Sequence, residues 1–180
     1  MVIFKIIFVY IGFKSCKRQQ TVNYQELFKG YNKILVPIDG SPNSLKAIAY
    51  GIGMAQRHDS ELIVLHVLYS QSGFVFHNGT ATGTITTSSL DDLNAEAKAE
   101  ARKWFDEISE SAMSKGVKVK TEVVLSVISI VEAILTYSEK ESIDLIIVGS
   151  KGRSGWKKLI LGSVASGIST YAHCPVLIVK

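Results

Sequence analysis

Along residues 33–180, five short apolar runs alternate with segments of helical periodicity. Most of the runs are continuous stretches of Val, Ile and Leu, which is typical of strands buried on both faces of a parallel sheet. The five predicted strands are Lys33–Ile38, Glu61–Val67, Lys118–Leu125, Leu145–Val148 and Val176–Val179. Because a helical segment separates each strand from the next, the pattern predicts an α/β fold. An open, five-stranded parallel sheet would carry helices on both faces.

Local signals predict where the helices begin and end. Ser41 precedes a proline, which is typical of an N-cap followed by the first helical residue. Ser129 has a glutamate three residues later and fits a capping box. Gly116 is expected to terminate the long second helix. Residues 70–90 are rich in Gly, Ser and Thr without a steady period, so we predict a long flexible loop there.

Composition and charge limit the classes of function. Apolar residues make up 47% of the chain and charged residues 20%, which suits a packed core and argues against a mainly disordered chain. The net charge of +4 comes from residues 1–30, where five basic side chains accompany one acidic side chain; residues 31–180 hold fifteen of each sign. We therefore expect no nucleic-acid partner. Two cysteines, Cys16 and Cys174, cannot supply a disulfide scaffold, which favours a cytoplasmic protein.

The first thirty residues differ in character from the rest. Residues 1–13 read MVIFKIIFVYIGF, an apolar stretch that is too short to span a bilayer as a helix and is interrupted by Lys5. We therefore expect no stable membrane insertion. A basic stretch follows the apolar one, which is the reverse of the order in a secretory signal. Three interpretations stay open: a misplaced start of the chain, a short strand or interfacial anchor with a basic flank, and an export signal.

Residues that end or follow the predicted strands are the candidates for a site, because ligands of open parallel sheets bind beyond the carboxyl ends of the strands. Residues 37–41 end the first strand, and Val67 ends the second. A glycine-rich turn, residues 149–155, follows the fourth strand, and Gly162-Ser163 opens the last helix. Together the turn and the helix start form the pattern G-x2-G-x9-G-S.

This pattern suits the capture of phosphate groups. Glycines let backbone N–H groups turn toward an anion and let it approach closely. A helix that begins at Gly162 points its free N–H groups and positive dipole end at the same place, and the Ser163 hydroxyl adds a donor. Four basic side chains are close in sequence: Lys151, Arg153, Lys157 and Lys158. The combination predicts a site for a triphosphate.

Asp39, at the end of the first strand, is expected to accept hydrogen bonds from ribose hydroxyls or a base, or to reach a metal ion on the phosphates. The alternative is that Asp39 only caps the next helix and that the glycines only shape turns. His66 lies inside an apolar strand and is expected to be a core histidine with a satisfied ring. We identify no base for a water that attacks the γ-phosphate, so no catalytic residue is assigned and hydrolysis would be slow at most.

At these residues the chain resembles the universal stress protein family. The matching stretches are KILVPIDGS, LIVLHV, DLIIVGSKG, LILGSVA and CPVLIVK, in the family's order, across residues 32–180. The resemblance implies a Rossmann-like fold of the adenine-nucleotide alpha hydrolase type with strand order 3-2-1-4-5. It implies one domain, residues 31–180; the N-terminal extension, residues 1–30, is not a feature of the family. It also implies a homodimer paired through the last strand, Val176–Val179, and a role in the stress response.

The pattern G-x2-G-x9-G-S is similar to that of the family's ATP-binding branch. The resemblance therefore implies ATP as the ligand, with Mg²⁺ or Mn²⁺ on the phosphates and no metal held by protein side chains alone. Carried over residue by residue, Pro37 and Asp39 match positions beside the adenosine, and Val67 matches the backbone contact to adenine. The wall on the ribose side matches Val148 and Gly149. The phosphate cradle matches Gly152, Gly162, Ser163 and Val164, with Arg153 beside it.

Two other functions stay open. A module of the same fold with an empty pocket, tethered by residues 1–30, would bind partner proteins instead of nucleotides. A receiver domain would be phosphorylated on Asp39, but such sites need an acidic cluster, and here the third strand ends in Leu125-Ser126. The leading interpretation is an ATP-binding regulatory protein of the stress response, with weak ATPase activity at most.

Overall fold

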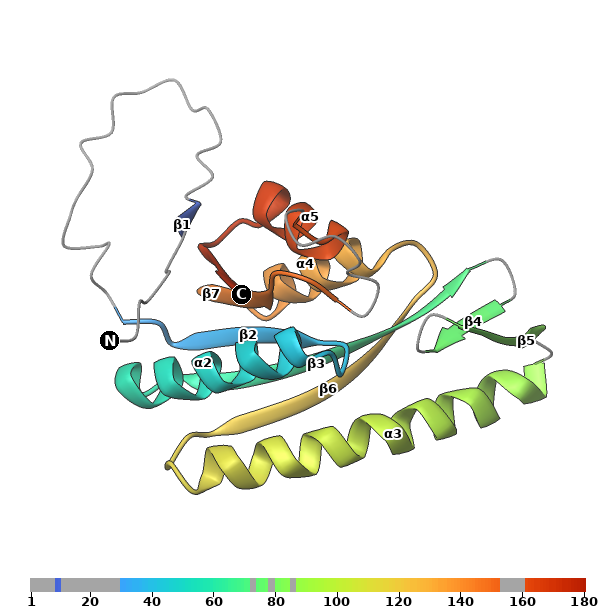
Figure 1. Ribbon diagram of the computed structural model, residues 1–180, viewed down its shortest axis with the longest axis horizontal. Helices are drawn as coiled ribbons and strands as arrows, with labels where there is room; N and C mark the ends of the chain where they lie inside the picture. Colours follow the sequence, from blue (N-terminus) through green and yellow to red (C-terminus); the bar gives the residue numbers. More distant parts are fainter. Residues whose placement is uncertain (1–8, 11–29, 72–73, 78–79, 85–86, 153–160) are drawn as a thin grey trace.

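Five parallel strands of the described residues form the centre of the sheet (Figure 1). The computed structural model describes residues 9–10, 30–71, 74–77, 80–84, 87–152 and 161–180. The parallel strands are β2 (Lys33–Ile38), β3 (Glu61–Gln71), β6 (Val119–Ser126), β7 (Leu145–Gly149) and β8 (Val176–Val179). Their order is β6-β3-β2-β7-β8, which confirms the predicted order 3-2-1-4-5. The direction of winding therefore reverses between β2 and β7, where open sheets of this kind bind ligands.

Among the described residues, two helices cover each face of the sheet (Figure 1). The helices are α2 (Pro42–His58), α3 (Thr87–Met113), α4 (Ile130–Lys140) and α5 (Ser163–Tyr171). Alternation along β2 sends Ile34 and Val36 into the core beneath α2 and α3, and Leu35 into the core beneath α4 and α5. Since all three side chains are fully buried, the continuous apolar runs are explained by burial on both faces.

The predicted helix ends are confirmed where the structure describes them. The side chain of Ser41 accepts a hydrogen bond from the N–H of Ser44, with proline in the first turn of α2. Ser129 caps α4 in the same way, accepting from the N–H of Glu132 at 2.9 Å. Gly116 follows α3 with a φ of 70° and is the left-handed residue that lets the chain leave the helix.

The prediction of a flexible loop over residues 70–90 was wrong. β3 continues to Gln71, an antiparallel hairpin of β4 (Phe74–His77) and β5 (Thr80–Thr84) follows, and α3 begins at Thr87. β6 pairs with one edge of β3 as far as Tyr69. β4 therefore lies on the edge that β3 shares with β2, beyond the end of β2. Threonine and aromatic residues favour a strand when a neighbouring edge offers unpaired backbone groups. The local sequence does not show that such an edge is present, so the strands were not predicted.

A further short strand, β1 (Val9–Tyr10), lies against the opposite edge of the sheet. It runs antiparallel to β8, with Val9 opposite Leu177 and Tyr10 opposite Val176. The apolar N-terminal stretch thus contributes a strand, in agreement with one of the three interpretations of this segment. In the described part of the chain, no helix is both long and apolar enough to cross a membrane.

Candidate functional site

The first component of the candidate site is the turn between β2 and α2. β2 ends at Ile38, and Asp39, Gly40 and Ser41 carry the chain into the helix. Gly40 has a φ of 75°, a conformation that favours glycine. Oδ1 of Asp39 accepts a hydrogen bond from the N–H of Ser41 at 3.0 Å. This bond fixes one carboxylate oxygen in the turn before the helix, where Ser41 and not Asp39 is the N-cap, and leaves Oδ2 directed elsewhere.

The second component is the turn after β7. A Cβ atom at Gly149 would lie 2.8 Å from the backbone carbonyl of Asn43, so the absence of a side chain lets β7 pack directly on the first turn of α2. The next residue, Ser150, is buried and donates its N–H to the carbonyl of Val179 at 2.7 Å. Residues from β7, β8 and α2 thereby hold the start of the glycine-rich turn.

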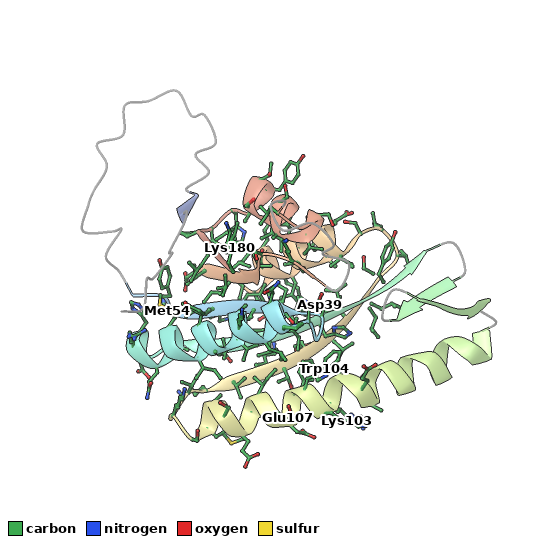
Figure 2. The ribbon with its side chains drawn as sticks, in the orientation of Figure 1. Asp39, Met54, Lys103, Trp104, Glu107 and Lys180 are labelled. Atoms are coloured by element: carbon green, nitrogen blue, oxygen red, sulfur yellow. The ribbon has the colours of Figure 1, made fainter. Side chains whose placement is uncertain are left out.

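The two turns meet at Gly152. A Cβ atom at this glycine would lie 2.7 Å from Oδ2 of Asp39, closer than real Cβ contacts allow. Residues separated by more than a hundred positions in the chain therefore touch through a glycine and a carboxylate. Figure 2 shows Asp39 near the end of β2, the strand at which the winding direction reverses.

The third component is the N-terminus of α5. Gly162 is its N-cap and donates its N–H to the carbonyl of Ser150 at 2.9 Å, while its own carbonyl accepts from Ser166. A Cβ atom at Gly162 would lie 3.4 Å from Cα of Lys151, so this residue also packs tightly on the glycine-rich turn. The N–H groups of Ser163 and Val164 have no carbonyl partner within the helix, by the geometry of helix ends. They supply hydrogen-bond donors and positive potential beside Gly152.

The remaining predicted residues fall along the same edge of the sheet. Pro37 lies near the end of β2, opposite Leu65, and Val67 lies just beyond the last residue of β3 that pairs with β2. Val148 is buried in β7. Lys151 is half-buried, whereas Arg153, Lys157 and Lys158 lie outside the described residues. The structure therefore places every described residue of the predicted site either at the carboxyl ends of β2, β3 and β7 or at the N-terminus of α5.

One feature of this edge was not predicted from the sequence. The ring of His66 is hydrogen-bonded to the carbonyl of Ile38, with Nδ1 and the oxygen 2.9 Å apart, and it forms a T-shaped contact with the ring of Trp104 of α3. The expectation of a core histidine is confirmed by its burial. Its bond to the residue before Asp39 is new, and the aligned register of β2 and β3, which places Ile38 opposite His66, is the signal that could have revealed it.

Three ionisable side chains outside the candidate site, Cys174, Lys120 and Tyr137, have shifted pKa values. Burial raises the pKa of the Cys174 thiol to about 11, so the sulfur is protonated at neutral pH and is a poor nucleophile. Lys120 pairs with Glu122 at 3.1 Å and with Glu141 at 3.8 Å, and burial raises the pKa of the neighbouring Tyr137 hydroxyl. Among the described residues, no three His, Cys, Asp or Glu side chains gather as a metal site.

Comparison with known proteins agrees with this architecture. The family model described as the universal stress protein family matches residues 30–180. The universal stress protein YxiE of Bacillus subtilis is 35% identical over 152 residues, which cover 83% of this chain and 99% of that protein. The universal stress protein MJ0531 of Methanocaldococcus jannaschii is 34% identical over 150 residues, covering 83% of this chain and 82% of that protein.

Solved structures show the same fold. The universal stress protein UspA from Lactobacillus plantarum superposes with a TM-score of 0.69 at 24% identity, covering 83% of this chain and 98% of that one. Two further universal stress proteins of this fold are complexes, one with cAMP at a TM-score of 0.59 and one from Archaeoglobus fulgidus with dAMP at 0.57. The match over five-sixths of the chain, together with the shared strand order, shows that the chain belongs to the universal stress protein family.

Proposed function

We propose that this protein is an ATP-binding regulatory protein of the cytoplasmic stress response. The observation that carries the proposal is the meeting of Gly152 with the Asp39 carboxylate beside the N-terminus of α5. Backbone N–H groups and a carboxylate converge there at the topological switch point of the sheet. That combination suits a ligand with phosphates at one end and hydroxyl groups at the other. The two complexes of the same fold, with cAMP and dAMP, support an adenine nucleotide.

In this proposal each end of the nucleotide has its own partners. The phosphates bind to the turn at Gly152 and to the N–H groups of Ser163 and Val164, with the Gly162 N-cap shaping the approach. Asp39 Oδ2 accepts from the ribose or contacts Mg²⁺ or Mn²⁺ carried by the phosphates. The base lies toward Pro37 and Val67, and the wall on the ribose side is formed by Val148 and Gly149. Arg153 would add a charge to the phosphate end.

We further propose that the protein binds ATP as a signal and hydrolyses it slowly at most. Asp39 would lie on the sugar or metal side of the ligand, away from a water that attacks the γ-phosphate. Binding would stabilise the folded state by mass action, and the resulting change in population would be the output that partners detect. Residues 31–180 would form this binding unit, with residues 1–30 as an extension.

Two measurements test the proposal on the full chain. Mass spectrometry of gently purified protein should detect a co-purified adenine nucleotide. Isothermal titration calorimetry should show saturable binding of ATP. Titration with GTP tests the contribution of the base, and titration with inorganic triphosphate tests that of the phosphates alone. Absence of binding by every adenine nucleotide tested would favour the alternative of an interaction module with an empty pocket.

Replacing Ser163 with alanine should weaken ATP binding about five- to tenfold, because it removes one hydroxyl donor to a charged oxygen. The N–H groups of α5 stay in place, so binding should be reduced rather than abolished. Ser169→Ala is the matched control on the same helix, where the hydroxyl bonds the carbonyl of Ser166. Titration of both variants with ATP should show a loss of affinity for Ser163→Ala alone. Equal affinities would show that the Ser163 hydroxyl does not contact the phosphates.

We also propose self-association through the edge of β8, Val176–Val179. β1 pairs with that edge at Val176 and Leu177, so a second copy could pair there only after β1 leaves. The double variant Val9→Pro, Tyr10→Pro removes the N–H groups that β1 can offer. Sedimentation velocity over a range of concentrations should then show a larger dimer fraction than in the unmodified chain. An unchanged or smaller dimer fraction would contradict competition for this edge.

A further inference from the structure

A side chain of the neighbouring strand β3 forms a hydrogen bond at the end of β2, next to the candidate site. His66 of β3 is the register partner of Ile38, the last residue of β2. Its Nδ1 lies 2.9 Å from the Ile38 carbonyl oxygen. A carbonyl can only accept, so Nδ1 carries the proton in this bond. The side chain of His66 thus secures the last peptide group before Asp39.

The His66 ring is itself held in place. It is 8% exposed, and the ring of Trp104 meets it edge to face, with centroids 5.4 Å apart and planes at 85°. Trp104 comes from α3 and rises toward the sheet below Asp39 (Figure 2). The geometry is one that aromatic pairs prefer, and it restricts rotation of the imidazole. A buried ring with a fixed orientation can act as a rigid donor.

The carboxylate that follows has little freedom to adjust. Oδ1 of Asp39 is bound to the N–H of Ser41, and Oδ2 lies where a Cβ atom at Gly152 would be 2.7 Å away. A rotation of the peptide between Ile38 and Asp39 would move both oxygens relative to Gly152 and to the N-terminus of α5. The position of this carboxylate therefore depends on what fixes the end of β2.

We propose that His66, oriented by Trp104, is a positioning residue that sets the Asp39 carboxylate for the nucleotide. The inference rests on the proposed function and adds to it a group that does not touch the ligand. Core packing alone does not call for an imidazole here, since the flanking positions of β3 are filled by leucine and valine. The hydrogen bond is what an apolar side chain could not provide.

A double-mutant cycle on the full chain tests this role through the dissociation constant of ATP. His66→Leu should weaken binding about tenfold, the equivalent of one lost hydrogen bond. His66→Asn places an N–H donor near the position of Nδ1 and should stay within about threefold of the unmodified protein. Trp104→Leu, which leaves the strands untouched, should weaken binding about threefold.

The decisive comparison is made in an Asp39→Asn background. If His66 and Trp104 act through the carboxylate, neither leucine variant should change the affinity there by more than about twofold. Equal losses with and without the Asp39 carboxylate would overturn the inference and leave the proposed function standing. An unmodified protein that binds no adenine nucleotide would remove the proposed function and the inference together. The thermal unfolding midpoint of each variant identifies any that fail to fold. If His66→Leu fails to fold, the cycle of Trp104→Leu with Asp39→Asn decides whether the inference holds.

Discussion

Replacing Gly152 with valine is expected to weaken ATP binding about a hundredfold or more while the protein stays folded. A Cβ atom at this position would lie 2.7 Å from Oδ2 of Asp39, so the carboxylate must move. Oδ1 is held by Ser41, and the displaced group would lose its contact to the ligand. The added side chain would also crowd the phosphates. Loss of two charge-assisted hydrogen bonds corresponds to about 3 kcal/mol or a hundredfold in affinity.

The fold should tolerate this change because Gly152 is exposed and the obstructing atom is the end of a side chain. Titration calorimetry with ATP, together with thermal unfolding of the same samples, separates the two effects. An affinity close to that of the unmodified protein would show that Gly152 and Asp39 do not frame a phosphate site. A large drop in the unfolding temperature would instead assign the glycine a structural role.

Replacing Gly149 with alanine is expected to lower the free energy of unfolding by about 2 kcal/mol. Here the new methyl group would lie 2.8 Å from backbone atoms of Asn43 and 3.0 Å from the backbone nitrogen of Ser44. Backbone in the capped first turn of α2 cannot swing aside as a carboxylate can, so β7 and α2 must separate. The obstacle is space rather than strain, because Gly149 lacks the positive φ seen at Gly40 and Gly116.

Gly53→Ala is the matched control for this substitution. Gly53 lies within α2, and a Cβ atom there would have only the end of the Arg57 side chain near it, at 3.8 Å. The alanine should raise the free energy of unfolding by about 0.5–1 kcal/mol through helix propensity. Chemical denaturation of the two variants should therefore give shifts of opposite sign. Destabilisation by both, or by neither, would contradict the packing argument.

Much of the fold was predictable because the determining signals are local. A continuous apolar run indicates a doubly buried strand, and Ser41 and Ser129 mark helix starts through bonds that span three residues. Gly116 marks a helix end through its own backbone conformation. The strand order required the resemblance to a known family, since local pattern does not decide which parallel strands are neighbours.

The parts that escaped prediction depend on contacts between distant segments. β3 extends beyond the end of β2, and the part of its edge that β2 leaves unpaired is where the hairpin of β4 and β5 forms. The sequence spacing singled out Gly152 and Asp39 separately, but only the folded sheet places one against the other. His66 was assigned to the core correctly, yet its link to Ile38 depends on strand register, which single residues do not reveal.

The unequal lengths of the strands have a consequence for how this chain can be altered. β2 stops level with His66, whereas β3 and β6 stay paired as far as Tyr69, so the sheet has a step at its carboxyl side. The hairpin is anchored on that step and contributes to none of the four parallel pairings. Its length can therefore change without rearranging the scaffold, and the hairpin is the place where an inserted segment or a fluorescent reporter should be tolerated.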